Sequence, residues 1–415
     1  MQRIYMDANA TTPLLPDVFE AMRPFWIEHF GNASSIHQQG QQARAAVDRA
    51  RESVARMLHC RASEIVFTSG GTESDNLALS GALDQASQNL APGDPLHLIT
   101  SSTEHHAVLH AAEALAKTGC TPTGRPVQIT FLPCNPQGLI EPETLQAALR
   151  PNTRLVSIIY ANNETGVIQP IPALAAIAHR TGALFHTDAV QAAGKLPLDL
   201  APQGPLRDVD LLSVSGHKMY APQGTGILFV RRNVRLAPLF HGGSHERQRR
   251  AGTENVPGIV ALGKAAELTQ SWLAADSTED LAAADSPAHL TALRDRLEQG
   301  LLATIPECGV NGAGTPRVCN TTNLYFDHVE AEALVIALDL KGLSVSGGSA
   351  CQSGATEPSH VLTAMGLTTP RARASIRLSL SRRSTAAEVD AALQIIPTAV
   401  SRLRDLSPTW HKPAA

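Results

Sequence analysis

Residues 209–230 read VDLLSVSGHKMYAPQGTGILFV. Two short apolar runs, Val209–Val214 and Ile227–Val230, enclose the tetrapeptide SGHK at 215–218 and a glycine-spaced turn. Apolar runs of this length, bounded by turn residues, are typical of buried strands. A lysine at the end of such a strand is badly placed as a solvated charge, because burial lowers the pKa of its amine. The stretch therefore predicts a sheet with a reactive amine, Lys218, at the end of one strand.

Strand-like runs of the same character recur through the first 230 residues. They are Glu64–Thr68, Leu96–Thr100, Val127–Leu132, Arg154–Tyr160, Ala183–Thr187, Leu211–Ser213 and Gly226–Val230. Helical patterns lie before or between them, for example in Gln41–Leu58, Ala107–Lys117 and Ile171–Arg180. Strands that alternate with helices favour an α/β fold with a mainly parallel, seven-stranded sheet covered on both faces. Such sheets bind ligands at the carboxyl ends of their strands.

The pattern changes past Asn255. Val256–Ala275 reads as one long helix, and the alanine-rich, acidic stretch Asp276–His289 reads as an exposed connection whose role stays open. Beyond it, the helical stretches are Leu290–Ile305, Ala331–Leu340 and Ala386–Leu403, and the strand-like stretches are Arg317–Phe326 and Ser375–Leu380. We therefore predict a large domain over residues 14–263 and a small α/β domain built from residues 1–13 and 264–415.

Composition argues against several classes of partner. The chain has 415 residues, 43% of them hydrophobic and 4% aromatic, with a formal net charge of −4. The weak negative charge and the scarcity of aromatic side chains argue against nucleic-acid binding. No apolar run approaches the roughly eighteen residues that span a bilayer, so we expect a cytoplasmic protein that does not use a membrane. The six cysteines lack a C-x-x-C pair, and we expect free thiols.

A carboxylate lies at the end of a second strand. Leu184–Thr187 is followed directly by Asp188, about thirty residues before Lys218. A lysine and an aspartate delivered by neighbouring strand ends are what pyridoxal phosphate requires: an amine for a Schiff base and an anion against the pyridinium nitrogen. Gln191 can reach the same ring from one helical turn further on. This combination points to an enzyme.

Two glycine-containing stretches are candidate phosphate sites. Residues 64–79 read EIVFTSGGTESDNLAL, in which Gly70 and Gly71 allow close approach of the backbone and Thr72 adds a hydroxyl at a helix N-terminus. An ordinary glycine turn with a threonine cap explains this motif about equally well. The basic loop RRAGT at 249–253 is likewise consistent with phosphate contacts or with solvated surface.

Two further strand ends carry polar side chains. The stretch SSTEHHAVLH at 101–110 offers a histidine that could lie flat on a cofactor ring, although capping or core histidines are commoner. His106 and His110 share a helix face, yet no H-E-x-x-H motif or cysteine pair supports a zinc site, and none is predicted. Asn163, in ANNETG at 161–166, is placed to hydrogen-bond a cofactor oxygen or a substrate carboxylate, although asparagines in such turns usually serve the backbone.

One cysteine near the C-terminus differs from the others. The stretch SGGSACQSGATEPSH at 346–360 surrounds Cys351 with glycine and serine, whereas Cys60 and Cys319 lie beside apolar periodic segments and are interpreted as packing residues. A thiol on a polar, glycine-rich loop is accessible, and a mobile loop can carry it into and out of a site. Arg377, on the next strand, could clamp a substrate carboxylate with its two-pronged guanidinium.

Together these residues resemble the NifS/IscS-type cysteine desulfurases, within the class V branch of fold-type I pyridoxal-phosphate enzymes. The matching motifs follow one another along nearly the whole chain. They are MDANATTP at 6–13, FGN at 30–32, TSGGTESDN at 68–76, EHHAV at 104–108, NNETG at 162–166, HTDAVQ at 186–191, SGHK at 215–218, RRAGTEN at 249–255, SAC at 349–351 and SIR at 375–377.

The resemblance implies a role for each matching position. Lys218 would hold pyridoxal 5′-phosphate as a Schiff base and move the substrate Cα proton, while His105 would stack on the ring and assist that transfer. Asp188 would pair with the ring nitrogen and Gln191 with the ring hydroxyl. The other cofactor contacts would come from Gly71, Thr72, Asn163, Ser215, His217 and, from the partner subunit of a homodimer, Thr253. The substrate, L-cysteine, would be held by Asn32, Asn163 and Arg377.

Cys351 would be the nucleophile that attacks the sulfur of cofactor-bound L-cysteine, giving a persulfide and releasing L-alanine. The long loop around it fits the group associated with iron–sulfur cluster assembly, which implies a scaffold protein as the sulfur acceptor. Transfer to tRNA thiolation or to nitrogenase assembly stays open, as does transient ligation of a cluster by Cys351. The chain departs from the family where Gly347 replaces a serine, where Ser244 replaces a common glycine, and in its longer acidic stretch.

Two alternatives are kept. In a selenocysteine lyase or another class V lyase or aminotransferase, Cys351 would be incidental. The chain could also be a non-catalytic sulfur-relay protein on an inherited enzyme scaffold. Four residues argue against this second alternative, because a protein that had lost the activity would not be expected to retain all of them: Lys218, Asp188, His105 and Arg377.

Overall fold

The computed structural model describes residues 3–88, 90–91, 93–275, 285–347, 357–408 and 410. Their main feature is a seven-stranded sheet in the order β2-β8-β7-β6-β5-β3-β4. The strands are β2 (Ile65–Thr68), β3 (Leu96–Ser101), β4 (Val127–Leu132), β5 (Thr153–Ser157), β6 (Leu184–Asp188), β7 (Leu211–Ser215) and β8 (Gly226–Val230). β8 is antiparallel to both of its neighbours, and all other pairs are parallel. The predicted α/β fold with a mainly parallel seven-stranded sheet is confirmed.

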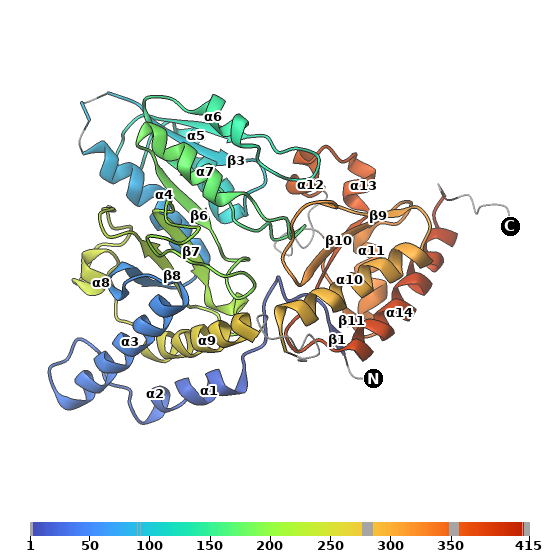
Figure 1. Cartoon of the computed structure of the whole chain (residues 1–415), viewed down its shortest axis with the longest axis horizontal. Helices are drawn as coiled ribbons and strands as arrows, with labels where there is room; N and C mark the ends of the chain where they lie inside the picture. The colour runs from blue at the N-terminus through green and yellow to red at the C-terminus, as the bar shows by residue number, and fades with distance from the viewer. Residues whose placement is uncertain are drawn as a thin grey trace.

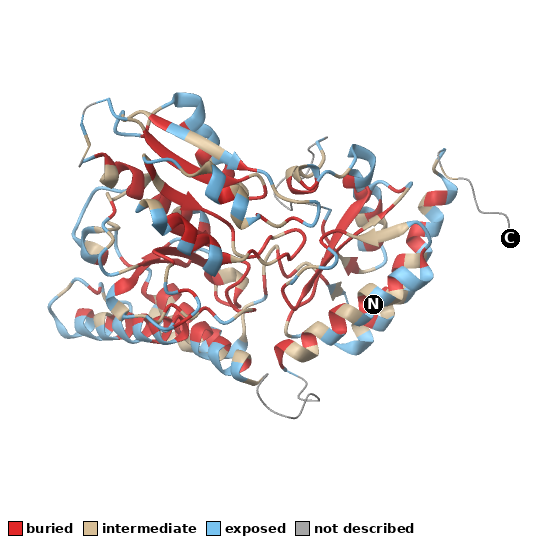
Figure 2. Ribbon diagram, turned by 45° about the horizontal axis from the view of Figure 1, so that its top comes forward, coloured by how far each residue is buried: buried red, intermediate tan, exposed pale blue. Residues whose placement is uncertain are grey.

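Both faces of this sheet are buried except at the edge strand β4, where Gln128 and Phe131 are exposed, and this burial explains the largely apolar runs in the sequence. Along β2, Ile65 and Phe67 pack toward one face and Val66 toward the other, as the two-residue period of a strand requires. Helices α4 (Gly71–Ser87) and α5 (His106–Thr118) cover the Val66 face. The opposite face is covered by α3 (Gln38–Met57), α6 (Pro142–Ala148), α7 (Ile171–Ala178) and α9 (Val256–Ala274). Figure 2 shows the buried strands beneath helices whose outer sides are exposed.

A second, smaller core lies beside the first, around α10, α11 and α14 in Figure 1. It contains an antiparallel sheet of order β12-β10-β9 and a parallel pair, β1 and β11. The strands are β1 (Ile4–Tyr5), β9 (Cys308–Val310), β10 (Thr321–Phe326), β11 (Leu343–Ser344) and β12 (Ser375–Ser379). The helices that pack on them are α10 (Pro287–Thr304), α11 (Ala331–Asp339) and α14 (Ala386–Asp405). A smaller C-terminal α/β unit was expected from the sequence and is confirmed.

The start of α10 differs from the sequence expectation. The helix begins at Pro287 rather than at Leu290, because the Ser286 hydroxyl accepts a hydrogen bond from the His289 N–H (3.2 Å) and caps it. The end of the acidic stretch 276–289 is therefore helical, while residues 276–284 lie outside the described residues.

The boundary predicted near residue 263 falls inside α9. There Gly263 lets α9 approach α3 closely, since a Cβ at this position would lie 2.6 Å from the Cα of Ala50. This close packing ties the first turns of α9 to the larger core, whereas Trp272 near its end belongs to the smaller one. The division into domains at this residue stays a prediction.

The remaining helical elements are short. They are α1 (Pro16–Met22), α2 (Pro24–Ile27), α8 (His245–Gln248), α12 (His360–Ala364), α13 (Thr369–Arg373), and the 3-10 turns η1 (Ala62–Glu64), η2 (His179–Thr181) and η3 (Gly216–Lys218). Within the described part of the chain, no helix combines the length and the apolar character that crossing a bilayer requires.

The N-terminal segment connects the two cores. β1 pairs with β11 of the smaller core, and the Ala8 N–H donates to the carbonyl oxygen of Ser379 (3.0 Å). A few residues later, the Thr12 N–H donates to the carbonyl oxygen of His217 (2.9 Å), beside the end of β7. The segment between Ala8 and Thr12 therefore lies where the smaller core meets the carboxyl edge of the large sheet.

Candidate active site

Four neighbouring parallel strands end at the same edge of the large sheet. In the sheet order β3, β5, β6, β7, their carboxyl ends lead to His105, Asn163, Asp188 and Lys218. Because the pairing is parallel, these ends align, and side chains that are far apart in the sequence come to one edge. The sequence analysis singled out each of the four, and the structure places all of them at this edge.

Lys218 ends the short turn η3, which continues β7. Its Nζ donates to the carbonyl oxygens of Asn9 (2.5 Å) and Ala10 (2.7 Å) in the N-terminal segment. Glycine is required at the start of the turn, since a Cβ at Gly216 would lie 2.2 Å from the Thr225 hydroxyl oxygen. Backbone carbonyl groups therefore hold the amine at the sheet edge.

Asp188 is almost completely buried, and its Oδ1 accepts a hydrogen bond from the Val190 N–H (2.9 Å). Burial raises the pKa of this carboxyl group, and the nearby positive charge of Lys218 partly opposes that effect. A second buried carboxyl group, Asp75, has its pKa raised well above the usual range by burial and by the charge of Asp188. A cation against Asp188 would stabilise its ionised form, so the position suits a protonated ring nitrogen.

His105 both caps a helix and lies at the site. Its Nδ1 accepts a hydrogen bond from the Ala107 N–H (3.2 Å) at the start of α5, which leaves the ring proton on Nε2. Burial, followed by the positive charge of Lys218, lowers the pKa of His105 to about 4. The ring is therefore neutral near pH 7, and with Nδ1 occupied by the Ala107 N–H it can stack on a cofactor ring and donate a hydrogen bond from Nε2.

The glycine turn between β2 and α4 has the features of an anion site. α4 begins at Gly71 without a side-chain cap, so its first N–H groups can face an anion. A Cβ at Gly226 would lie 2.6 Å from the Cα of Gly70, and this close backbone approach requires glycine. Thr72 is exposed on the first turn of α4, and the Ser215 side chain lies next to Gly71. The turn therefore suits a phosphate.

Two other predicted cofactor residues contact the N-terminal segment. The Nδ1 of His217 lies 3.2 Å from the hydroxyl oxygen of Thr11, and burial together with the charge of Lys218 lowers the pKa of His217 to about 4. The buried side chain of Gln191 donates from Nε2 to the carbonyl oxygen of Asn9 (3.0 Å). Segments that are far apart in the sequence thus converge on residues 9–11.

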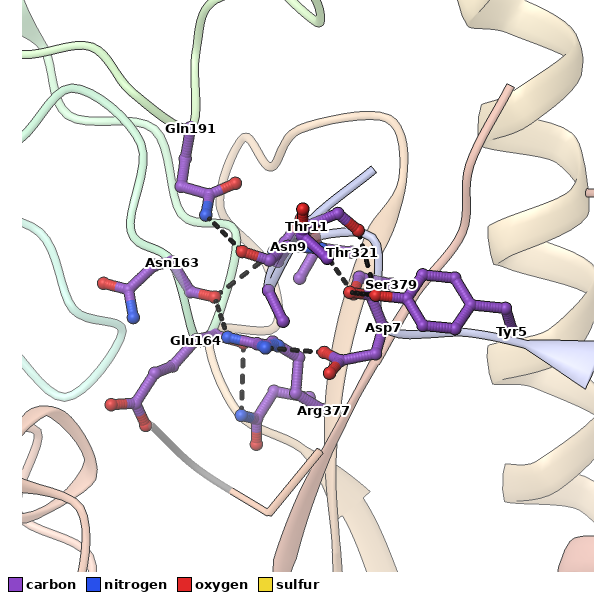
Figure 3. A network of polar contacts seen from close by, with 12 residues as sticks. Tyr5, Asp7, Asn9, Thr11, Asn163, Glu164, Gln191, Thr321, Arg377 and Ser379 are labelled. Carbon is purple, nitrogen blue, oxygen red and sulfur yellow. Dashed lines mark hydrogen bonds and ion pairs between the residues drawn. The ribbon is translucent and has the colours of Figure 1, made fainter. Parts of the chain in front are cut away.

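Arg377, on β12 of the smaller core, also lies at the site, next to Asn163 and Asp7 (Figure 3). Its buried guanidinium forms an ion pair with Asp7 (2.7 Å) and donates from Nη1 to the carbonyl oxygen of Asn163 (2.8 Å). Asn9 links the same groups, because its Nδ2 donates to the Asn163 carbonyl (3.2 Å) and to the Thr321 hydroxyl (2.9 Å). Among the described residues, the Nε of Arg377 and the Oδ1 of Asn163 are buried without a hydrogen-bond partner. An unused donor on a buried guanidinium suits a carboxylate ligand.

Cys351 lies outside the described residues, but the chain on both sides of it is held at this site. Ser346 pairs with Arg377 through two backbone hydrogen bonds of 2.7 and 3.2 Å. The Ser359 hydroxyl donates to the buried carboxyl group of Glu164 (2.6 Å), directly after Asn163 in the sequence. The segment that carries the predicted nucleophile therefore leaves and returns beside the predicted substrate residues.

Contacts within the chain do not bring two of the predicted residues to this edge. Asn32 is exposed between α2 and α3, and its Oδ1 accepts a hydrogen bond from the Ser34 N–H (2.8 Å). Thr253 is exposed after α8, and within the described residues no hydrogen bond links it to another candidate. Both roles stay predictions, that of Thr253 as a contact from the partner subunit.

Sequence reasoning missed several residues that hold the site together. Asp7, Asn9 and Glu164 entered the sequence analysis only as letters of matching motifs, and Lys195 did not enter it at all. A signal for the first two was the polar run at 7–12, which follows a short apolar stretch and is too polar for a buried strand. A signal for Lys195 was its position four residues after Gln191 in an otherwise apolar segment.

The histidines of α5 form a ring stack. The rings of His106 and His110 lie 4.4 Å apart, and His360 contacts His106 at 4.7 Å. Over the ranges that the structure describes, no cluster of three or more histidine, cysteine or acidic side chains could hold a metal ion.

The residues at this edge fit pyridoxal phosphate. They provide an amine at Lys218, a buried carboxyl group at Asp188 and an uncapped helix N-terminus for the phosphate. The unpartnered polar atoms of Asn163 and Arg377 are further groups that a ligand would satisfy.

Known proteins are similar to this chain in sequence and fold over nearly their full length. The family model described as aminotransferase class V matches residues 4–392. A cysteine desulfurase of Nostoc sp. is 48% identical over 408 residues, which cover 98% of this chain and 95% of the relative. A cysteine desulfurase IscS of Methanosarcina thermophila is 45% identical over 409 residues, with 99% and 95% covered. A solved structure titled NifS-like protein has a TM-score of 0.83 at 34% identity and covers 97% of this chain and 100% of its own.

Proposed function

The chain belongs to the class V aminotransferase family, and we propose that it is a cysteine desulfurase that uses pyridoxal 5′-phosphate. Relatives that match almost the whole chain carry the name cysteine desulfurase. The observation that carries the proposal is the placement of Lys218 and Asp188 at the ends of the paired parallel strands β7 and β6. An amine and a buried carboxyl group at neighbouring strand ends are the two groups that this cofactor needs.

Pyridoxal phosphate, when bound, supplies the electron-withdrawing ring that makes the substrate Cα–H acidic. Asp188 keeps the ring nitrogen protonated, because a buried carboxylate stabilises an adjacent cation. The N-terminus of α4, with Thr72 and Ser215, binds the phosphate. Lys218 would carry the cofactor and move the Cα proton, and neutral His105 would support this transfer by stacking on the ring and by donating a hydrogen bond from its Nε2–H.

The substrate class follows from the wall formed by β12. Arg377 is buried, and among the described residues its Nε has no hydrogen-bond partner. Its Nη1 donates to the main-chain carbonyl of Asn163, and the side-chain Oδ1 of Asn163 also lacks a partner. A guanidinium binds the α-carboxylate of an amino acid, and the amide can accept from its amino group or position the cofactor. We therefore assign L-cysteine binding to Arg377 and Asn163.

Cys351 is the proposed sulfur acceptor within the enzyme. Its thiolate attacks the sulfur of L-cysteine, so that the Cβ–S bond breaks, an S–S bond forms, and L-alanine leaves after Cβ and Cα are reprotonated. Other thiols are poor candidates: burial raises the pKa of Cys60 to about 12 and that of Cys319 to about 11. The anchoring of Ser346 and Ser359 at the site supports the choice of Cys351.

The persulfide sulfur must then leave the enzyme. We propose an acceptor protein for iron–sulfur cluster assembly, since one of the relatives is named IscS. We also propose a cytoplasmic homodimer, in which Thr253, exposed in the single chain, completes the phosphate site of the partner subunit.

The test is L-alanine release and persulfide formation from L-cysteine by the purified, cofactor-loaded protein. Wild type should form both, and Cys351→Ser should lose both while the absorbance of the bound cofactor stays unchanged. The matched control is Cys308→Ser, because the Cys308 thiol donates to the Ile305 carbonyl (2.9 Å) and a hydroxyl can do the same. Cys308→Ser should keep wild-type turnover.

Two other results would contradict the proposal, one at the role of Cys351 and one at the enzyme assignment. If Cys351→Ser desulfurates at the wild-type rate, Cys351 is incidental, as in a selenocysteine lyase or another class V enzyme. If the wild type takes up no pyridoxal phosphate, the enzyme assignment itself fails.

A further inference from the structure

Lys195 is a buried lysine next to the site, and the chemistry proposed above does not use it. It is 8% exposed, and its Nζ donates to the side-chain Oε1 (2.6 Å) and the main-chain oxygen (3.1 Å) of Gln191. Within the described residues it forms no ion pair with a carboxylate. Burying an ammonium group without a carboxylate partner destabilises the fold. Because both described hydrogen bonds of Lys195 go to Gln191, a role for Lys195 would lie in its contact with this glutamine.

The contacts of Gln191 fix which way its amide points. On one side, Nε2 donates to the carbonyl oxygen of Asn9 (3.0 Å), which can only accept. On the other side, Oε1 accepts from the Nζ of Lys195 (2.6 Å), which can only donate while it is protonated; burial lowers the pKa of this amine to about 7. Exchanging the amide oxygen and nitrogen would place oxygen against oxygen and N–H against N–H. Lys195 therefore holds the Gln191 amide with its NH₂ group toward Asn9.

This NH₂ group lies close to the reactive amine. Lys218 donates to the same Asn9 carbonyl oxygen that accepts from Gln191, so the two side chains converge on one atom. An amide NH₂ has two hydrogens, and the Asn9 carbonyl uses one of them. The second remains for an acceptor on a group attached to Lys218, such as the ring oxygen of the cofactor.

We propose that Lys195 is a positioning residue that orients Gln191 to donate its amide N–H to the ring oxygen of pyridoxal phosphate. The inference rests on the proposed function and names a residue to which that function assigns no role. Lys195 acts through Gln191 and does not itself touch the cofactor. The charged or ionisable groups that face Lys195 from other elements are Lys218, Cys319, Arg377 and Arg382.

The test uses the absorbance of the bound cofactor as a function of pH, which reports the hydrogen bond to the ring oxygen without turnover. A donor to that oxygen favours its negative form, so loss of the donor should raise the midpoint of the absorbance change, by about one pH unit. Lys195→Met, which fills a similar volume without a donor, should show this rise. It should also bind pyridoxal phosphate about tenfold more weakly. The control Lys117→Met, on the exposed side of α5, should match wild type in both measurements.

A double-variant comparison separates positioning from a general effect on the fold. Gln191→Ala should raise the midpoint as Lys195→Met does, and adding Lys195→Met to Gln191→Ala should raise it no further. If Lys195→Met does not fold, Lys195→Gln replaces it, because the shorter amide cannot reach Oε1 from the same backbone position.

The outcomes are distinguishable. An unchanged midpoint in the folded Lys195 variant, or an equal further rise in the Gln191→Ala background, overturns the inference and leaves the proposed function intact. Wild-type protein that takes up no pyridoxal phosphate overturns the proposed function and, with it, this inference.

Discussion

Asp7 is the counter-ion of Arg377: its Oδ1 lies 2.7 Å from the Nη2 of a guanidinium that is 1% exposed. The same guanidinium binds the carbonyl oxygen of Asn163, and its own backbone pairs with Ser346. One arginine thus holds the N-terminal segment, the turn after β5 and the start of the segment that carries Cys351. In the absence of substrate, Asp7 supplies the negative charge that a buried arginine needs.

A carboxylate ligand should therefore restore part of the stability that is lost when Asp7 is replaced. Asp7→Asn should lower the free energy of unfolding by about 3 kcal/mol, because Arg377 stays buried without a counter-ion. L-Alanine, whose carboxylate would bind Arg377, should raise the melting temperature of Asp7→Asn more than that of wild type. Thermal unfolding with and without L-alanine measures both effects. Equal shifts in the two proteins would contradict carboxylate binding by Arg377, and Asp339→Asn, at an exposed pair, should behave as wild type.

The anion site depends on the close backbone approach between β8 and the glycine turn. A Cβ at Gly226 would lie 2.6 Å from the Cα of Gly70, so Gly226→Ala must displace the turn that leads into α4. We expect pyridoxal phosphate to bind at least about tenfold more weakly, as for the loss of one charge-assisted hydrogen bond.

Titration of the apoenzyme with cofactor checks this expectation. Gly347→Ala is the control, because a Cβ there meets the Ala331 Cβ at an ordinary 3.6 Å. A folded Gly226→Ala protein with wild-type cofactor affinity would show that the turn does not bind the phosphate.

The sequence predicted the large sheet well because both of its faces are buried. A strand covered on both sides is usually apolar at most positions, so β2 and β8 leave short, clear apolar runs, whereas β6 (LFHTD) is recognised only by its first residues. Parallel strands then place the residues that follow them at one edge, which is why Asp188 and Lys218 could be paired from their positions alone.

Other parts of the site cannot be predicted from the identity of single residues in the sequence. The acceptor for Lys218 and Gln191 is the backbone carbonyl of Asn9, a group that every residue carries. Its place at the sheet edge follows from the pairing of β1 with β11 in the smaller core, a contact between segments far apart in the sequence. Residues such as Asn32, whose contacts within one chain do not reach this edge, cannot be placed from local patterns.

Glu104 should make the free energy of unfolding depend on pH. It is fully buried, and its Oε1 accepts from the Ser101 hydroxyl (2.6 Å) and the Ile159 N–H (2.8 Å). Burial raises the pKa of Glu104 to about 8, against about 4.3 in an unfolded chain. The folded state therefore keeps a proton that the unfolded state has lost, so the stabilisation is complete below pH ~4.3 and disappears as the pH rises through 8.

The substitution Glu104→Gln keeps the shape of the side chain and removes its titratable carboxyl group. Relative to wild type, this variant should gain free energy of unfolding as the pH rises from 5 to 8, by at most about 1.4 kcal/mol per pH unit. Urea unfolding at several pH values measures the difference. Glu113→Gln, on the exposed side of α5, should show none. A difference for Glu104→Gln that stays constant across this range would mean that Glu104 is ionised in the folded protein.

The segment before Thr253 is anchored by a second buried ion pair. The Glu246 carboxylate binds Arg51 of α3 in bidentate fashion (2.7 and 2.8 Å) and also accepts from the Phe67 N–H (3.1 Å) on β2. Glu246 has a φ of 48°, a conformation that glutamine adopts at a similar cost, so Glu246→Gln isolates the charge. Because Arg51 would remain buried beside a neutral group, the free energy of unfolding should fall by about 3 kcal/mol.

Removal of both charges tests the cause of that loss. The double variant Arg51→Met/Glu246→Gln leaves no unpaired charge in the interior, so urea unfolding should find it more stable than Glu246→Gln alone. Glu20→Gln, which breaks the exposed pair with Arg23, should change stability by less than about 0.5 kcal/mol. If the double variant is the less stable one, Arg51 stabilises the fold through its other contacts, such as its hydrogen bond to the Ile65 carbonyl (2.8 Å), and an unpaired charge does not explain the loss in Glu246→Gln.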